Sequence, residues 1–207
     1  IATFTDLGIG ALSGTYTITY TTDLSQSLNV TTDQSATVTF GNAHHLVMST
    51  QPVGGKTGDV LTTTPVVHVV DLYGNRVTSS SAVVTAAMTS PLNGDVLSGT
   101  SATAASGVAS FGALNIRTLP GSYTLTFTSN GLTAVTSATF TIVHADAAKL
   151  VITQQPVGGN ATGERLTTQP VVEIRDRFDN VATSNTDTVT ISVASGLGGS
   201  LNTSRVS

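Results

Sequence analysis

A long internal repeat constrains the fold of this chain more than any other feature. The run LVMSTQPVGG at residues 46–55 returns 104 residues later as LVITQQPVGG at residues 150–159. The run LTTTPVVHVVDLYGN at 61–75 likewise matches LTTQPVVEIRDRFDN at 166–180, and segment 1–21 matches segment 108–128. Repetition at a fixed period indicates successive copies of one structural unit, and about 104 residues is the size of a small domain.

The phase of the repeat predicts how the chain divides. Residues 1–43 match the second half of a unit, residues 44–146 form one complete unit, and residues 147–207 match the first half of the next. A half unit cannot bury its apolar face by itself. We therefore expect each half to be completed, either by a longer chain that continues at both ends or by the complementary half of an identical neighbouring chain.

Within the complete unit, apolar side chains alternate with hydroxyl side chains. In GSYTLTFTS at 121–129, the residues Tyr123, Leu125 and Phe127 lie on one face of an expected strand and Ser and Thr on the other. Comparable short runs occur at 45–50, 65–70, 82–88, 96–98, 108–114 and 134–143. About seven strands in one unit predict an all-β fold, a tandem series of immunoglobulin-like β-sandwiches with Greek-key connections.

Turn-forming residues mark specific points along these strands. Gln51-Pro52, followed by Gly54-Gly55, predicts that the first strand breaks there and changes sheet, because proline removes a ladder donor. The motifs DLYGN at 71–75 and DRFDN at 176–180 predict tight turns in which the Asp side chain binds the backbone.

Composition agrees with an all-β fold and removes several classes of function. The chain holds 38 Thr and 22 Ser, and Thr favours strands. Eight Lys and Arg against twelve Asp and Glu form no basic surface, so we expect no nucleic-acid partner. No apolar run approaches the roughly 20 residues that cross a bilayer, so we expect no membrane span in this segment. The absence of Cys excludes disulfides and thiolate metal sites.

Taken in order, the motifs STQPVGG, TTTPVVHVVDLYGNRVT, GVASFGALNI and GSYTLTFTSNGLTAVTSATFTI resemble the bacterial immunoglobulin-like repeats of large surface proteins and adhesins. The resemblance implies an extracellular or cell-surface location and a structural role as a spacer in a stalk or filament. It also implies that the partners are neighbouring repeats, of the same chain or of identical chains. A second role stays open, in which loops at the sandwich end, such as 89–95 and 194–200, bind a glycan or protein ligand.

Four aromatic residues are expected to be structural. Tyr16 and Tyr123 each follow a glycine at the start of a late strand, where sandwich proteins place a tyrosine corner whose hydroxyl binds the backbone. Stacking of these rings on a ligand is the alternative interpretation. Phe4 and Phe111 occupy matching places in the repeat, and we expect both to be structural, with Phe111 on the inward face.

Acidic and catalytic motifs are sparse. Calcium needs six to eight oxygen ligands, and the best candidates are Asp176 with Asp179 and Asp71 with Asp146, which form no dense acidic run. We therefore expect no metal and no cofactor. The sequence has no GxSxG, HExxH or P-loop motif, so we expect no enzyme activity. The histidines near the unit boundaries are interpreted as surface linker residues, with a metal-binding or pH-sensitive hinge as the alternative: His44, His45 and His144.

Overall fold

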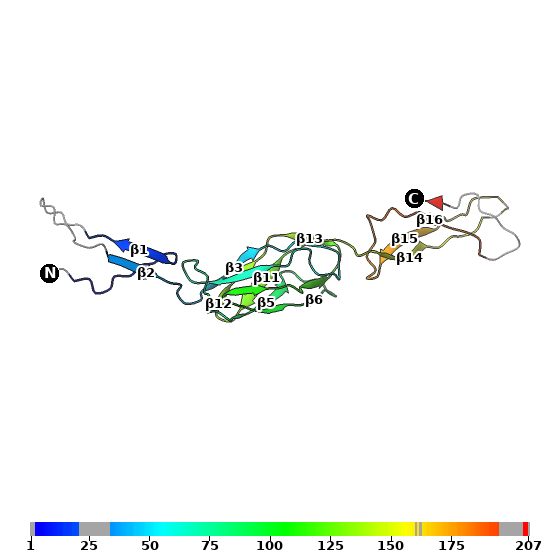
Figure 1. Ribbon diagram of the computed structural model, residues 1–207. Coiled ribbons are helices and arrows are strands. Elements are labelled where there is room, and N and C mark those ends of the chain that lie inside the picture. Colours follow the sequence, from blue (N-terminus) through cyan, green and yellow to red (C-terminus); the bar gives the residue numbers. More distant parts are fainter. Residues whose placement is uncertain (1–2, 21–33, 160, 162, 195–204, 207) are drawn as a thin grey trace.

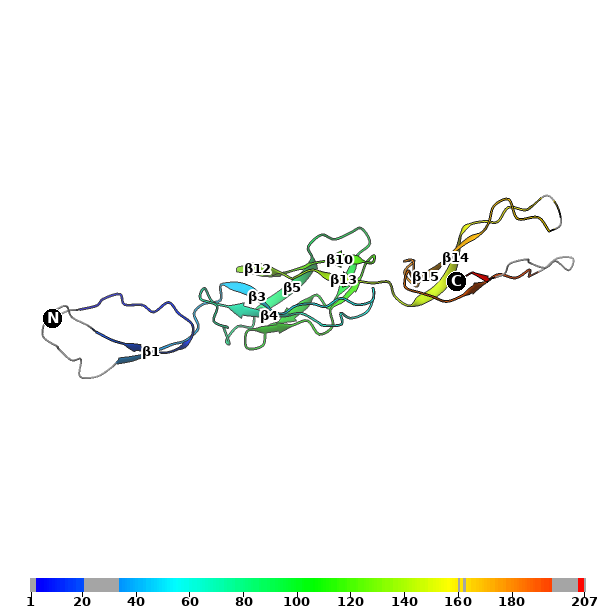
Figure 2. The same cartoon turned by 90° about the horizontal axis from the view of Figure 1, so that it is seen from above.

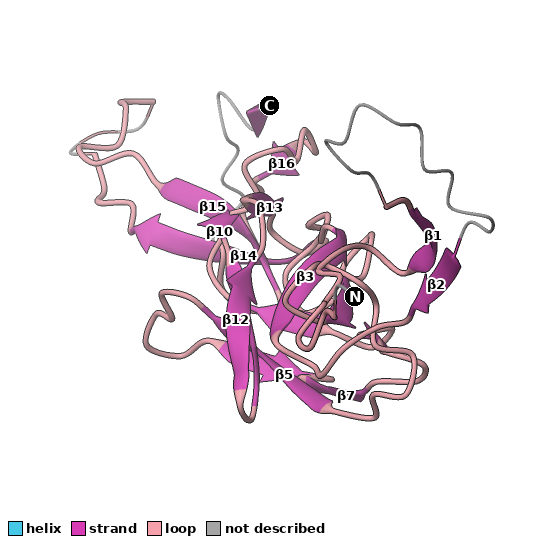
Figure 3. Cartoon of the chain, turned by 90° about the vertical axis from the view of Figure 1, so that its left-hand side faces the viewer, coloured by secondary structure: helices cyan, strands magenta, loops and turns pink. Residues whose placement is uncertain are grey.

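The computed structural model describes residues 3–20, 34–159, 161, 163–194 and 205–206. Figures 1 and 2 show three parts in a row: an N-terminal hairpin, a central sandwich and a more open C-terminal part. The regular elements of the described residues are β-strands (Figure 3). These residues include no helix that is long and apolar enough to cross a membrane.

The central part is built on one long sheet with the strand order β7-β5-β11-β12-β3-β4-β8. Neighbouring strands are antiparallel, except that β12 and β3 meet in parallel at the pair Thr133 and His45. Two further pairs complete this part, β6 with β9 and β10 with β13. The bounds are β3 (His45–Thr50), β4 (Val66–Val70), β5 (Val83–Met88), β6 (Val96–Ser98), β7 (Ser101–Thr103), β8 (Val108–Ser110), β9 (Asn115–Arg117), β10 (Gly121–Tyr123), β11 (Leu125–Ser129), β12 (Leu132–Thr136) and β13 (Phe140–Ile142).

Side chains from both arms of the long sheet meet in one core, so the sheet folds over as a sandwich. In β5, every second residue is buried, and Leu125 and Phe127 are buried in β11. The Phe127 ring contacts the Phe111 ring, which follows β8 in the other arm. The all-β sandwich fold predicted from the alternation is therefore confirmed. The buried apolar cluster comprises Leu46, Leu61, Val67, Val69, Val84, Ala86, Met88, Ala102, Ala104, Ala109, Phe111, Leu114, Ile116, Leu125, Phe127, Phe140 and Ile142.

The first strand of the sandwich changes partner after Pro52, as the sequence predicts. Before this residue, β3 pairs with β4. After it, the chain runs parallel to the segment that follows β13: the Val143 N–H donates to the Gly55 carbonyl at 2.9 Å, and the Thr57 N–H donates to the Val143 carbonyl at 2.8 Å. Gly54 lies against the Thr141 backbone with no room for a Cβ atom. The chain that begins with β3 thus pairs first with β4 and then with the segment after β13.

The strands of the central part are shorter and more numerous than predicted. The predicted run 108–114 contains only β8. The Leu114 N–H bonds to the Phe111 carbonyl and closes a turn, and β9 begins after this turn at Asn115. The predicted run 134–143 divides into β12 and β13 at Ser137, whose side-chain oxygen accepts the Leu125 N–H and replaces a ladder bond. Strand β7 has no apolar alternation long enough to predict it.

The two terminal parts are smaller assemblies of strands. In the N-terminal part, β1 (Gly14–Ile18) pairs antiparallel with β2 (Gln34–Val38). In the C-terminal part, β14 (Ala147–Gln154) pairs with β15 (Val171–Asp176), and β16 (Val189–Thr190) pairs with β17 (Arg205–Val206). The core cluster lies between Leu46 and Ile142, within the predicted complete unit 44–146. The boundaries of the units stay a prediction.

Apolar residues of the terminal parts are exposed where their repeat counterparts are buried. Leu46 is 2% exposed, whereas its counterpart Leu150 is 57% exposed. Phe111 is 2% exposed, whereas its counterpart Phe4 is 64% exposed and lies beside the Tyr20 ring. No second layer of the described residues covers Phe4, and its structural role stays a prediction.

Candidate interface sites at the two unit junctions

Two turns with the same D-x-x-x-N pattern lie where the parts of the chain meet. We call them turn 71–75 and turn 176–180. In each, the N–H of the Asp donates to the carbonyl of the Asn at 2.9 Å, and the N–H of the fourth residue donates to the Asp carbonyl at 3.2 Å. The fourth residue has a positive φ, 89° for Gly74 and 72° for Asp179, a conformation that glycine adopts more readily than aspartate. The predicted tight turns are confirmed at both places.

The Asp71 carboxylate is the centre of turn 71–75. Its Oδ1 accepts the N–H groups of Tyr73 at 3.0 Å and Asn75 at 2.8 Å. Its Oδ2 accepts the Asn75 side-chain amide at 2.9 Å and the N–H of Gly41 at 2.8 Å. Burial by itself would raise the pKa of this carboxyl, but the four hydrogen bonds outweigh that effect and lower the pKa to about 2.

The Asp176 carboxylate makes the same four bonds in turn 176–180. Its Oδ1 accepts the N–H groups of Phe178 at 2.8 Å and Asn180 at 2.9 Å. Its Oδ2 accepts the Asn180 side-chain amide at 2.9 Å and the N–H of Ala145 at 2.8 Å. Burial of Asp176 opposes ionisation, but these bonds hold its pKa below the usual value. The same cage of donors thus surrounds a buried carboxylate in two consecutive units.

One donor in each cage comes from the linker that precedes the unit. Gly41 lies between β2 and β3, and Ala145 lies between β13 and β14. These two residues are 104 positions apart, which is the period of the repeat. Each cage therefore fastens a linker to the unit that follows it.

At the first junction, turn 71–75 also contacts the N-terminal part. The N–H of Ser13 donates to Oδ1 of Asn75 at 2.6 Å, and the Asn75 amide donates to the Ala11 carbonyl at 3.1 Å. The Tyr73 ring lies against Gly10, so closely that a Cβ at Gly10 would meet the phenol. Turn 71–75 therefore holds the loop that precedes β1.

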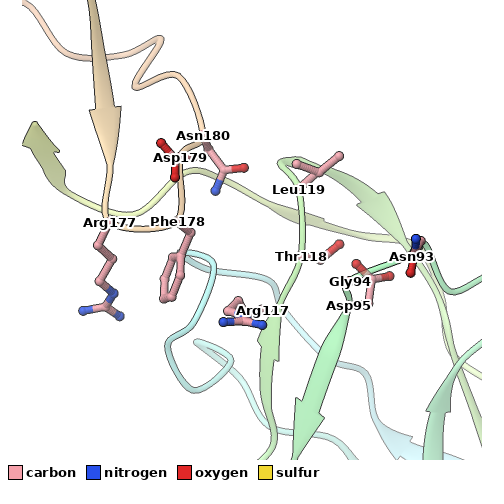
Figure 4. Close-up of a pocket in the computed structure, with 10 residues that line it drawn as sticks. All are labelled: Asn93, Gly94, Asp95, Arg117, Thr118, Leu119, Arg177, Phe178, Asp179 and Asn180. Atoms are coloured by element: carbon pink, nitrogen blue, oxygen red, sulfur yellow. The ribbon is translucent and has the colours of Figure 1, made fainter. Parts of the chain in front are cut away.

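At the second junction, turn 176–180 contacts the end of the central sandwich. The Arg117 guanidinium lies 5.8 Å from the centroid of the Phe178 ring, and the Arg177 guanidinium lies 4.7 Å from it. The same ring lies against Gly58. Figure 4 shows the Phe178 ring between Arg177 of the same turn and Arg117 of the central sandwich. The third residue of each turn, Tyr73 or Phe178, thus touches the preceding part.

Two ion pairs accompany the second junction. Arg177 lies 3.2 Å from Asp59, and Lys56 lies 2.5 Å from Asp146. Solvent reaches all four side chains, so screening leaves each pair a small contribution to stability. The pairs add charge complementarity between the central sandwich and the segment that follows it.

A crevice of about 390 Å³ lies at the second junction. Ligand pockets in proteins are mostly apolar and enclosed, whereas most residues around this crevice are polar or charged. Residues 93–95, which belong to the predicted end loop 89–95, form one wall. Residues 195–200 of the matching loop 194–200 lie outside the described residues. Figure 4 shows the lining: Asn93, Gly94, Asp95, Arg117, Thr118, Leu119, Arg177, Phe178, Asp179 and Asn180.

The candidate calcium ligands face protein donors rather than one another. Asp71 belongs to the first junction, whereas Asp146 pairs with Lys56 at the second, so the two do not form a site. Asp176 is enclosed by N–H donors, and Asp179 lies 2.7 Å from Lys149. Among the described residues, no three His, Asp or Glu side chains gather around one point. The expected lack of a metal stays a prediction.

Tyr16 and Tyr123 bind the backbone in the same way. The Tyr123 hydroxyl donates to the Leu119 carbonyl at 2.7 Å, and the Tyr16 hydroxyl donates to the Leu12 carbonyl at 2.6 Å. The Tyr123 hydroxyl also accepts the Thr118 hydroxyl at 2.9 Å. This geometry is that of a tyrosine corner, and the structural role of both residues stays a prediction to be tested by substitution.

Sequence reasoning missed the residues that link the turns to their neighbours. Asn75 and Asn180 carry the side-chain amide of each cage, and Gly41 and Ala145 carry the linker N–H. Because Asn recurs four residues after Asp in both motifs, the sequence could have indicated that the Asn amide binds the Asp carboxylate. Nothing in the local sequence marks Gly41 or Ala145, because each donor lies about thirty residues before its acceptor.

No protein-family model and no curated protein matches the chain. Among solved structures, a glycosyl hydrolase family 2 member from Bacteroides cellulosilyticus matches 56% of this chain and 16% of its own, at 15% identity and a TM-score of 0.38. The β-glucuronidase of Parabacteroides merdae matches 51% of this chain and 14% of its own, at 16% identity and a TM-score of 0.34. A further family 2 β-glucuronidase matches 56% of this chain and 13% of its own, at 21% identity and a TM-score of 0.34. The likeness is to a small part of these chains, and the activity in their names stays with them.

Proposed function

We propose that this chain is a structural spacer, a series of immunoglobulin-like units in the stalk or filament of an extracellular surface protein. It has no catalytic role in this proposal. Its partners are neighbouring repeats, of the same chain or of identical chains. The proposal unites the internal repeat, the sandwich fold and the resemblance to tandem repeats of surface proteins.

The observation that carries the proposal is that the central sandwich contacts its two neighbours through opposite ends. At one end, Asn75 forms hydrogen bonds with the N-terminal part. At the other end, turn 176–180 contacts Gly58, Asp59 and Arg117 of the sandwich. The three parts accordingly lie in a line in two perpendicular views (Figures 1 and 2). In an array with contacts of this kind, length grows with the number of units.

Small-angle X-ray scattering tests the spacer role. One and then two further copies of residues 43–146, which span one full period of 104 residues, are inserted after residue 146 of the full chain. Each added copy should lengthen the particle by the same step, about 35 to 45 Å if the strands follow the long axis. A maximum dimension that fails to grow with each copy would contradict the proposal.

The crevice at the second junction favours a second candidate function, recognition of a glycan or protein ligand by the sandwich end. Its walls combine Phe178, two arginines and the loop residues 93–95. A glycan array probed with the full chain separates the two functions. A spacer shows no saturable binding, whereas binding that is lost in Arg117→Ala but kept in Arg76→Ala would establish recognition at the crevice.

A further inference from the structure

We propose that the D-x-x-x-N turn is the docking element of each unit and sets its angle to the preceding unit. The turn holds the linker with its buried carboxylate and holds the end of the preceding unit with its aromatic third residue. This inference rests on the spacer role for its biological meaning, since the angle between units matters only in an array. According to this inference, turns 71–75 and 176–180 each bind a surface of the preceding unit.

The cages leave the linkers almost no free length. At the second junction, Val143 is still bonded to Gly55 of the central sandwich, and Ala145 is already bonded to Asp176 of the next unit. One residue, His144, separates the two attachment points. Its ring is also engaged, with Nε2 2.8 Å from the Ser184 hydroxyl. A linker held at both ends within three residues cannot act as a free hinge.

The first junction repeats this arrangement. Val38 is paired with Gly14 in the N-terminal hairpin, and Gly41 is bonded to Asp71 of the central sandwich. Two residues separate these attachment points. The bonds to Gly41 and Ala145 are not needed to close the turns, because the N–H groups and the amide within each turn already bind the same carboxylate. The fourth bond therefore serves the junction.

The third residue of each turn supplies the contact that resists rotation. Tyr73 lies on Gly10 and Phe178 lies on Gly58, in each case on the preceding part and at a position without a Cβ. A glycine there lets the ring approach the backbone closely. A hydrogen-bonded linker by itself would still allow one unit to rotate relative to the next. A linker bond and a ring contact at separate points together fix both the direction and the rotation of the unit relative to the preceding one.

Electron spin resonance distances across the second junction test the proposal, and the absence of cysteine allows unique labelling. Spin labels are attached to the exposed positions Thr85→Cys in β5 and Gln155→Cys after β14 of the full chain. We expect one narrow distance distribution in the parent. In Asp176→Asn and in Phe178→Ala, the distribution should broaden about twofold or more, because domains without a firm interface move relative to each other. The control is Asp187→Asn, which removes an exposed carboxylate that accepts a bond from the Asn185 side-chain amide two residues away and should leave the width unchanged.

A second variant keeps the test valid if Asp176→Asn unfolds the C-terminal part. Ala145→Pro removes the linker N–H and restricts the linker backbone, but it leaves the Asp176 carboxylate and the bonds within turn 176–180 unchanged in sequence. It too should broaden the distribution. Unchanged widths in Ala145→Pro and Phe178→Ala, or a broad distribution in the parent, would overturn the inference. In that case, an equal increase in the maximum dimension with each added copy would still support the spacer role. The two experiments can therefore contradict one proposal without contradicting the other.

Discussion

The rings of Phe111 and Phe127 meet in an edge-type contact, with 5.1 Å between the ring centroids and 60° between the ring planes. Phe111 follows β8 at one end of the long sheet, and Phe127 lies in β11 of the other arm. The pair therefore joins the two layers of the sandwich. Aromatic pairs in this arrangement contribute beyond their buried area.

Replacement of Phe111 by alanine should destabilise the central sandwich. We expect a loss of about 3 to 5 kcal/mol in the free energy of unfolding, as for other buried phenylalanines, measured by urea denaturation of the full chain. Phe4→Ala is the matched control, because Phe4 holds the same place in the repeat but is exposed. That control should cost less than about 0.5 kcal/mol. Equal losses in the two variants would contradict the assigned core.

The two QPVGG motifs provide a second matched pair. A Cβ at Gly54 would collide with the Thr141 backbone, whereas a Cβ at Gly158 would meet no atom within 4 Å. Gly54→Ala should therefore destabilise the central sandwich by about 1 to 3 kcal/mol, as overpacked sites do. Gly158→Ala should leave stability nearly unchanged. If both variants had the same urea midpoint of unfolding as the parent protein, the close approach of Gly54 to β13 would be wrong.

The Tyr123 hydroxyl should stabilise the sandwich through its bonds to Leu119 and Thr118. Tyr123→Phe removes these bonds and keeps the ring, so we expect a loss of about 0.5 to 1.5 kcal/mol. Tyr16→Phe is the equivalent change outside the central sandwich, and it should not shift the unfolding midpoint of the sandwich. The ligand-stacking interpretation predicts instead that Tyr123→Phe retains full stability, since the ring remains.

Acid should weaken the central sandwich through Asp71. Because its pKa in the folded protein is about 2 and its ordinary value is 3.8, the folded state binds this proton less readily than the unfolded state. The stabilisation is therefore complete well above pH 3.8, decreases as the pH falls below that value, and is lost below about pH 2. The parent should lose stability relative to Asp71→Asn over this window, in urea denaturation from pH 5 to pH 2. Parallel pH profiles for the two proteins would show that Asp71 does not carry the effect.

Local patterns in the sequence predicted much of the fold. Alternation with period two placed the buried faces of β5 and β11, and the D-x-x-x-N pattern placed both tight turns. The break at Pro52 was also predictable, because proline removes a ladder donor wherever it occurs. These features depend on residues close together in the chain.

Only the tertiary structure decided which distant groups meet. Asp71 accepts a bond from Gly41, thirty residues away, and Asn75 donates to Ala11, 64 residues away. Asp71 and Asp146, paired in the sequence interpretation, lie at different junctions because a sandwich carries its entering and leaving segments at opposite ends. Phe4 and Phe111 share one motif yet differ in burial, since burial depends on the layer that covers a side chain. Local patterns determine strands and turns, whereas contacts between layers and units depend on the folding of the whole chain.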